Sequence, residues 1–132
     1  MQTKARILIV DDEKIILKAY PLELAAAGYE VFTASTGAEA LALIDRERVD
    51  IVYVDYTMPD MNGVTVCQKI KMRSPDTEVV LISGHRQDAE YLSSRMEEAG
   101  GRKKVLIKPL QENELTEMTD TIRQQQKDQQ EQ

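Results

Sequence analysis

The chain has 132 residues, a formal net charge of −6 and one cysteine, with 42% hydrophobic and 30% charged residues. This length and balance are typical of one globular domain, the negative charge argues against nucleic-acid binding, and a single cysteine excludes an internal disulfide. No apolar stretch approaches the roughly 20 residues that span a membrane. No signal-peptide region precedes the first apolar run, so we expect a cytoplasmic protein without a membrane partner.

Five short apolar runs alternate with stretches of helical periodicity. The alternation predicts β-α-β units, and therefore a parallel sheet covered by helices. We expect strands at about residues 5–10, 30–34, 50–54, 79–82 and 105–107. We expect helices at about residues 14–27, 37–47, 63–73, 86–99 and from 111 onward.

Local signals mark where several of these helices begin, end or bend. Thr36 and Glu39 have the spacing of a capping box and open the second helix. Pro75 ends the third, because a residue before proline is pushed out of helical geometry. Pro21 lies inside the first helix and removes one backbone hydrogen bond, so we predict a kink or a step there. The polar segment 124–132 lacks apolar periodicity, which is typical of a frayed helix end or the start of a linker.

A polar side chain follows four of the five predicted strands, at the point where each strand ends. They are the acid pair Asp11-Asp12 after the first strand, Asp55 after the third, Ser83 after the fourth and Lys108 after the fifth. Because the carboxyl ends of parallel strands meet at one edge, where ligands bind, we expect these side chains to lie together. Three carboxylates suit a divalent cation, and the hydroxyl and the amine suit a phosphoryl group.

The chain resembles the receiver domain of two-component response regulators over residues 5–123. The resemblance is carried by Asp11-Asp12, the run Asp55-x-x-Met-Pro-x-Met-x-Gly63, Ser83-Gly84 and Lys108-Pro109. It implies an α/β fold of the flavodoxin-like type. In that fold a doubly wound five-stranded parallel sheet, of strand order 2-1-3-4-5, is flanked by five helices in a three-layer sandwich. We therefore expect a receiver domain over residues 1–123 and a Gln-rich tail or linker over 124–132.

The resemblance implies that a histidine kinase or a phosphotransfer protein phosphorylates Asp55. Lys108 would pair with Asp55 before the reaction and with the phosphoryl oxygens after it, and Ser83 would donate its hydroxyl to a phosphoryl oxygen. The peptide bond between Lys108 and Pro109 is expected to be cis. Such a domain is a signalling module rather than an enzyme, because it catalyses only its own phosphorylation and dephosphorylation.

A magnesium ion is the cofactor that the resemblance implies, with Mn²⁺ as an alternative. Asp12, Asp55 and the backbone carbonyl of Thr57 would bind the ion directly, and Asp11 would act through water. Mg²⁺ suits such a site because it keeps several waters and takes few carboxylates. Thr57 and His85 lie beside the phosphoryl site in this family and would influence water access during dephosphorylation.

The output face in this family comprises the fourth helix, the fifth strand and the fifth helix. It would regulate a partner protein or a C-terminal output domain absent from this chain. A homodimer that forms through this face is a further possibility. The resemblance implies that movement of Ser83 is the switch. Val105 stands where the family usually has an aromatic residue, so output through rotation of an aromatic ring is not expected here.

The residues leave two other functions open. A receiver-like domain could bind proteins without phosphorylation, which the absence of an aromatic residue at Val105 favours. A phosphatase of the haloacid-dehalogenase type also uses an aspartate nucleophile after a parallel strand, with magnesium and a lysine. That family needs a second aspartate two positions after the nucleophile, where this chain has Thr57, and the chain is too short for a substrate cap.

Overall fold

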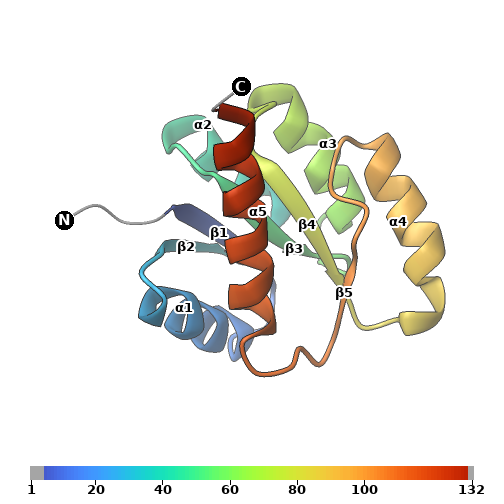
Figure 1. The fold of residues 1–132 in the computed structure, drawn as a ribbon. Coiled ribbons are helices and arrows are strands. Elements are labelled where there is room, and N and C mark those ends of the chain that lie inside the picture. Colours follow the sequence, from blue (N-terminus) through green and yellow to red (C-terminus); the bar gives the residue numbers. More distant parts are fainter. Residues whose placement is uncertain (1–4, 131–132) are drawn as a thin grey trace.

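The computed structural model describes residues 5–130, in which five parallel strands pair in the order β2-β1-β3-β4-β5 (Figure 1). The predicted fold class is therefore confirmed. The first four residues of the expected domain 1–123 and the last two of the tail 124–132 lie outside the described residues. The strands are β1 (Arg6–Val10), β2 (Glu30–Ala34), β3 (Ile51–Asp55), β4 (Glu78–Ser83) and β5 (Leu106–Ile107). The helices are α1 (Ile16–Ala26), α2 (Gly37–Arg46), α3 (Gly63–Arg73), α4 (Ala89–Glu98) and α5 (Glu114–Gln130).

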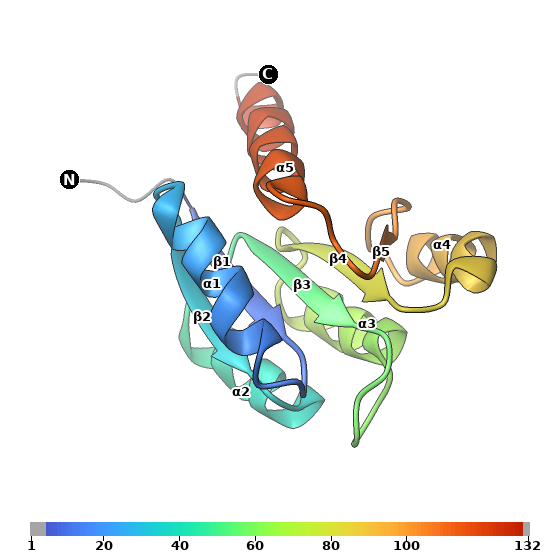
Figure 2. The same cartoon turned by 90° about the horizontal axis from the view of Figure 1, so that it is seen from below.

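The helices form two layers, with α1 and α5 on one face of the sheet and α2, α3 and α4 on the other (Figure 2). Successive residues of a strand point to opposite faces. In β1, Ile7 and Ile9 pack toward α1 and α5, and Leu8 and Val10 pack toward the other layer. Because both faces are covered, the inner strands β1, β3 and β4 are apolar over most of their length rather than alternating in polarity.

In the first two helices, the structure confirms only part of what the local sequence signals predicted. The hydroxyl of Thr36 accepts a hydrogen bond of 3.1 Å from the backbone N–H of Glu39, as a capping box requires. The carboxylate of Glu39 does not return to Thr36 but accepts the hydroxyl of Ser35 at 2.7 Å, so only half of the box forms. α1 continues without a break through Pro21, so the step predicted there is wrong, while the alternative of a kink stays a prediction. One missing donor in the second turn does not outweigh the packing of the helix on the sheet.

The last two helices begin later than the sequence indicated. A 3₁₀ turn over Arg86–Asp88 precedes α4, so the first residues of the predicted helix 86–99 are not α-helical. α5 begins at Glu114 because Asn113 has a positive φ of 66° and the carboxylate of Glu114 caps the N–H of Gln111 at 2.8 Å. Residues 124–130 continue α5. No helix within residues 5–130 is long and apolar enough to cross a membrane.

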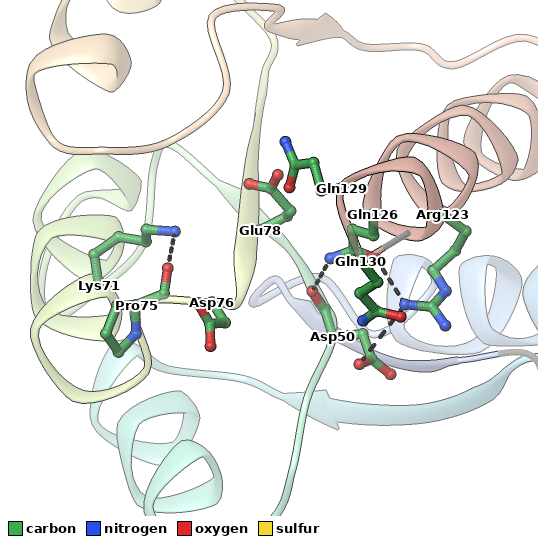
Figure 3. Close-up of a pocket in the computed structure, with 9 residues that line it drawn as sticks. All are labelled: Asp50, Lys71, Pro75, Asp76, Glu78, Arg123, Gln126, Gln129 and Gln130. Atoms are coloured by element: carbon green, nitrogen blue, oxygen red, sulfur yellow. Dashed lines mark hydrogen bonds and ion pairs between the residues drawn. The ribbon is translucent and has the colours of Figure 1, made fainter. Parts of the chain in front are cut away.

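α5 is anchored at the edge of the sheet where the strands begin. Gln126 donates to the backbone carbonyl of Asp50 at 3.4 Å, and Arg123 lies 3.9 Å from the Asp50 carboxylate. Lys71 donates to the carbonyl of Pro75 at 2.7 Å (Figure 3). These contacts border a hollow of about 390 Å³. The polar side chains around this hollow hold α5 and α3 to neighbouring loops. The hollow lies at the opposite edge of the sheet from the strand ends that carry the acid pair.

Candidate functional site

Three carboxylates gather where β1 and β3 end. The two strands are neighbours, with Val10 paired to Val54, so Asp11 and Asp55 leave the sheet side by side. Oxygens of Asp11, Asp12 and Asp55 all lie within 4.8 Å of one another. Asp11 and Asp55 are 2% and 6% exposed, whereas Asp12 faces solvent. Hard oxygen donors of this kind are the ligands that Mg²⁺ prefers, so the donor set fits the ion.

Lys108 reaches the same cluster from the loop after β5. Its ammonium nitrogen lies 3.0 Å from Asp11, 3.1 Å from Glu13 and 3.5 Å from Asp55. The peptide bond to Pro109 is cis, as expected. The pairing expected with Asp55 is present, but it is the longest of the three contacts. Apart from the place of Glu13 directly after the acid pair, no residue pattern indicated that it would be a partner of the lysine.

The electrostatics of the cluster follow from burial and from like charges. Burial, reinforced by the charge of Asp11, raises the pKa of the Asp55 carboxyl although the charge of Lys108 opposes the shift. Burial of the ammonium lowers the pKa of Lys108. Hydrogen bonds to Asp11 and Glu13 and the charges around them outweigh that effect, so the net pKa is raised. The lysine is therefore held charged, while Asp55 is held in a site that disfavours its charge.

Ser83 ends β4 and is fully buried. Its hydroxyl oxygen accepts the backbone N–H of His85 at 3.1 Å, and its backbone carbonyl accepts the N–H of Lys108 at 2.8 Å. The serine thus connects the start of the β4–α4 loop to the lysine loop. His85 and Thr57, which follow the ends of β4 and β3 by two residues each, are both exposed.

The loop that follows Asp55 is fixed to α2. Both carboxylate oxygens of Asp60 accept backbone N–H groups at the start of that helix, from Gly37 at 3.0 Å and from Ala38 at 2.9 Å. These hydrogen bonds lower the pKa of the Asp60 carboxyl. Like Glu13, Asp60 has a structural role that its sequence neighbours do not indicate. No local pattern connects two segments that lie 23 residues apart.

Val105 directly precedes β5 and is partly buried against the core. It lines a hollow of about 430 Å³ with side chains of α4. Val105 also lines a second hollow of about 290 Å³, together with Pro109. Val105, where the family usually has an aromatic residue, therefore lies directly before β5 and borders hollows on the face made by α4 and β5.

Comparison with known proteins places this arrangement in a family. The family model described as the response regulator receiver domain matches residues 7–120. A probable transcriptional regulator, ycf27, of Guillardia theta is 37% identical over 115 residues, which are 87% of this chain and 44% of that protein. A CheY-like receiver domain protein from Methanospirillum hungatei JF-1 has 30% identity and a TM-score of 0.84, covering 94% of this chain and 98% of that one.

A second similar structure is the response regulator protein TrrA from Thermotoga maritima in complex with Mg²⁺-BeF. It has 31% identity and a TM-score of 0.77, and the match covers 89% of this chain and 98% of that one. The chain belongs to the response regulator receiver domain family. It spans less than half the length of the first curated relatives that it matches, 44% of one and 26% of another.

Proposed function

We propose that Asp55 is the phosphoacceptor of a phosphorylation-switched receiver. The observation that carries this proposal is the placement of Asp55, which shares one edge of the sheet with a 4.8 Å carboxylate cluster and with the Lys108 ammonium at 3.5 Å. Carboxylates that suit a metal ion and a positive charge that suits phosphoryl oxygens thus both lie next to Asp55. Family membership supports this assignment.

The reaction transfers a phosphoryl group from a phosphohistidine of a kinase or phosphotransfer protein. An oxygen of Asp55 forms a bond to phosphorus while the N–P bond of the donor breaks, and the histidine nitrogen takes the electron pair of that bond. A carboxylate is a weak nucleophile, but phosphoryl transfer requires positioning and charge neutralisation more than covalent activation. Lys108, held charged by its neighbours, supplies part of that neutralisation.

Magnesium is the ion that this donor set suits best. Asp12, Asp55 and the Thr57 carbonyl would hold it directly, and Asp11 through water. When bound, the ion would offset the repulsion among the carboxylates and neutralise phosphoryl oxygens. The Mg²⁺-BeF complex of the similar TrrA protein supports this choice.

The switch is a hydrogen bond from Ser83. Once Asp55 carries a phosphoryl group, the hydroxyl of Ser83 donates to one of its oxygens. Because the same hydroxyl accepts the N–H of His85, the start of the β4–α4 loop moves with it. The face formed by α4, β5 and α5 then changes its fit to an effector protein or to an output domain beyond this chain. Val105 and the hollows beside it lie on this face, and the exposed His85 and Thr57 control water access to the phosphoryl group.

Intact mass after incubation with acetyl phosphate tests the assignment. With magnesium, the wild type should gain one phosphoryl group of about 80 Da, and without magnesium it should not. Asp55→Asn should gain nothing, whereas Asp45→Asn, an exposed aspartate on α2, should behave as wild type. A wild type that gains no phosphoryl group from this donor or from a kinase would instead support a protein-binding module that works without phosphorylation.

A further inference from the structure

The ammonium of Lys108 contacts three carboxylates, and one of them, Glu13, belongs neither to the proposed metal site nor to the phosphoacceptor. Of its three contacts, the hydrogen bonds to Asp11 and Glu13 are 3.0 and 3.1 Å long, while the Asp55 carboxylate lies at 3.5 Å. An ammonium group has three N–H donors, and Asp11, Glu13 and Asp55 together can engage all three. A donor held by Glu13 is not available to a phosphoryl oxygen on Asp55, so Glu13 competes with the phosphoryl group for the lysine.

Glu13 is held in this position by its backbone. Its N–H donates to the Asp11 carboxylate at 2.9 Å, and its carbonyl accepts the N–H groups of Ile16 and Leu17 at 3.1 and 3.2 Å, where α1 begins. The side chain is 55% exposed, whereas that of Lys108 is 18% exposed. A carboxylate at the edge of the site, fixed by a turn and by a helix start, thus extends over the lysine from the solvent side.

We propose that Glu13 is a positioning residue that holds Lys108 in the unphosphorylated state and so limits how readily the phosphorylated state forms. This inference rests on the proposed phosphorylation of Asp55. Lys108 must direct its donors toward the phosphoryl oxygens, and the donor held by Glu13 reaches them only when that contact is released. An interaction that is made only in the unphosphorylated state shifts the equilibrium away from the phosphorylated one.

A four-protein cycle in metal-free protein measures the contact itself. Wild type, Glu13→Gln, Lys108→Met and the double variant are unfolded in urea. If Glu13 holds Lys108, Glu13→Gln destabilises the wild type but has no effect in the Lys108→Met background. Equal effects of Glu13→Gln in both backgrounds would overturn the contact.

The consequence for the switch is measured with beryllofluoride, a phosphoryl mimic, by isothermal titration in saturating magnesium. Glu13→Gln should tighten beryllofluoride binding by roughly two- to fivefold, the range expected when a partly exposed ion pair is removed. The gain should be absent in the Lys108→Met background. Glu39→Gln is the matched control, since Glu39 is exposed, lies in the first turn of α2 and accepts a hydrogen bond from Ser35 instead of from a lysine. It should bind beryllofluoride as wild type does.

Three results would overturn the inference. Binding that does not tighten in Glu13→Gln is the first. An equal gain in Glu39→Gln or in the Lys108→Met background would assign the effect to general charge. A loss of magnesium affinity in Glu13→Gln of two- to fivefold or more would make Glu13 an outer partner of the metal site. Failure of the wild type to bind beryllofluoride and to gain a phosphoryl group would overturn the proposed function itself, and the urea cycle would still show whether Glu13 contacts Lys108.

Discussion

Gly63 lies so close to Asp55 that no side chain fits between them. A Cβ atom on Gly63 would be 2.6 Å from the backbone carbonyl oxygen of Asp55 and 2.6 Å from the Cδ1 atom of Leu81. The N–H of Gly63 also donates to the carbonyl of Tyr56 at 2.9 Å. The φ of Gly63 is not positive, so its backbone conformation does not require glycine. The lack of space for a side chain does. The start of α3 thereby fixes the backbone that carries the proposed phosphoacceptor.

Gly63→Ala should therefore destabilise the protein. The added methyl group must displace either the Asp55 backbone or Leu81, and overpacking of a tight site costs about 1–3 kcal/mol. Urea unfolding measures the loss. Gly84→Ala is the matched control, because a Cβ there would meet no atom within 4 Å. Equal stability of the two variants would show that the β3–α3 junction accommodates a side chain.

Much of the fold could be predicted because its signals are local. Apolar runs of strand length, Pro75 after α3 and polar residues at strand ends each depend on neighbours in sequence. The gathering of Asp11 and Asp55 also follows from the general rule for parallel sheets. The strand order came from the family resemblance, since alternation of strands and helices fits several orders.

Contacts between distant segments could not be predicted in the same way. Asp60 looks like an ordinary turn residue, yet it caps a helix that begins 23 residues earlier. Glu13 was visible as part of an acidic triplet, but its contact with Lys108 spans 95 residues and depends on the conformation of the lysine loop. Such contacts are set by tertiary packing, which no local residue pattern encodes.

Asp60→Ala should destabilise the protein in a pH-dependent way. Loss of a helix-capping side chain costs about 0.5–2 kcal/mol. The folded pKa of Asp60 is lowered, and the free carboxyl ionises near pH 3.9. The stabilisation is therefore fully present above about pH 4 and is lost as pH falls through the folded pKa. The free-energy difference between wild type and variant, measured by urea unfolding from pH 7 down to pH 3, should shrink toward acid.

Asp88→Ala is the control for this series. Asp88 directly precedes α4 but makes no side-chain capping hydrogen bond there. Its replacement should change stability little at any pH. A difference for Asp60→Ala that stays constant between pH 7 and pH 3 would contradict the role of the ionised carboxylate.

Asp55→Asn should stabilise the metal-free protein at neutral pH. Burial and the charge of Asp11 raise the folded pKa of Asp55, so the folded state disfavours the carboxylate. Between pH 3.9 and that folded pKa the native state binds the proton more tightly, and wild-type stability falls as pH rises. The variant lacks this decline. Urea unfolding in a chelator at pH 7 measures the gain, and a less stable variant would show that the Lys108 ion pair outweighs burial and repulsion.

Added magnesium should reduce the stability difference between Asp55→Asn and the wild type, because it stabilises the wild type more. A ligand that binds only the folded state raises stability with its concentration. The wild type should therefore gain stability with magnesium, while Asp55→Asn, which lacks one carboxylate of the 4.8 Å cluster, should gain less. Identical gains would place the metal away from Asp55.

Ser83→Ala should separate phosphorylation from its output. The hydroxyl contacts neither the carboxylates nor Lys108 through its side chain, so phosphorylation by acetyl phosphate should continue. The variant loses the acceptor for the His85 N–H and the donor for a phosphoryl oxygen, so the β4–α4 loop no longer follows the phosphoryl group. NMR chemical-shift changes on addition of beryllofluoride should then reach Asp55 and its loop but not α4 and β5. Ser83→Thr, which keeps the hydroxyl, should restore the shifts at α4, and full shifts in Ser83→Ala would show that another residue transmits the change.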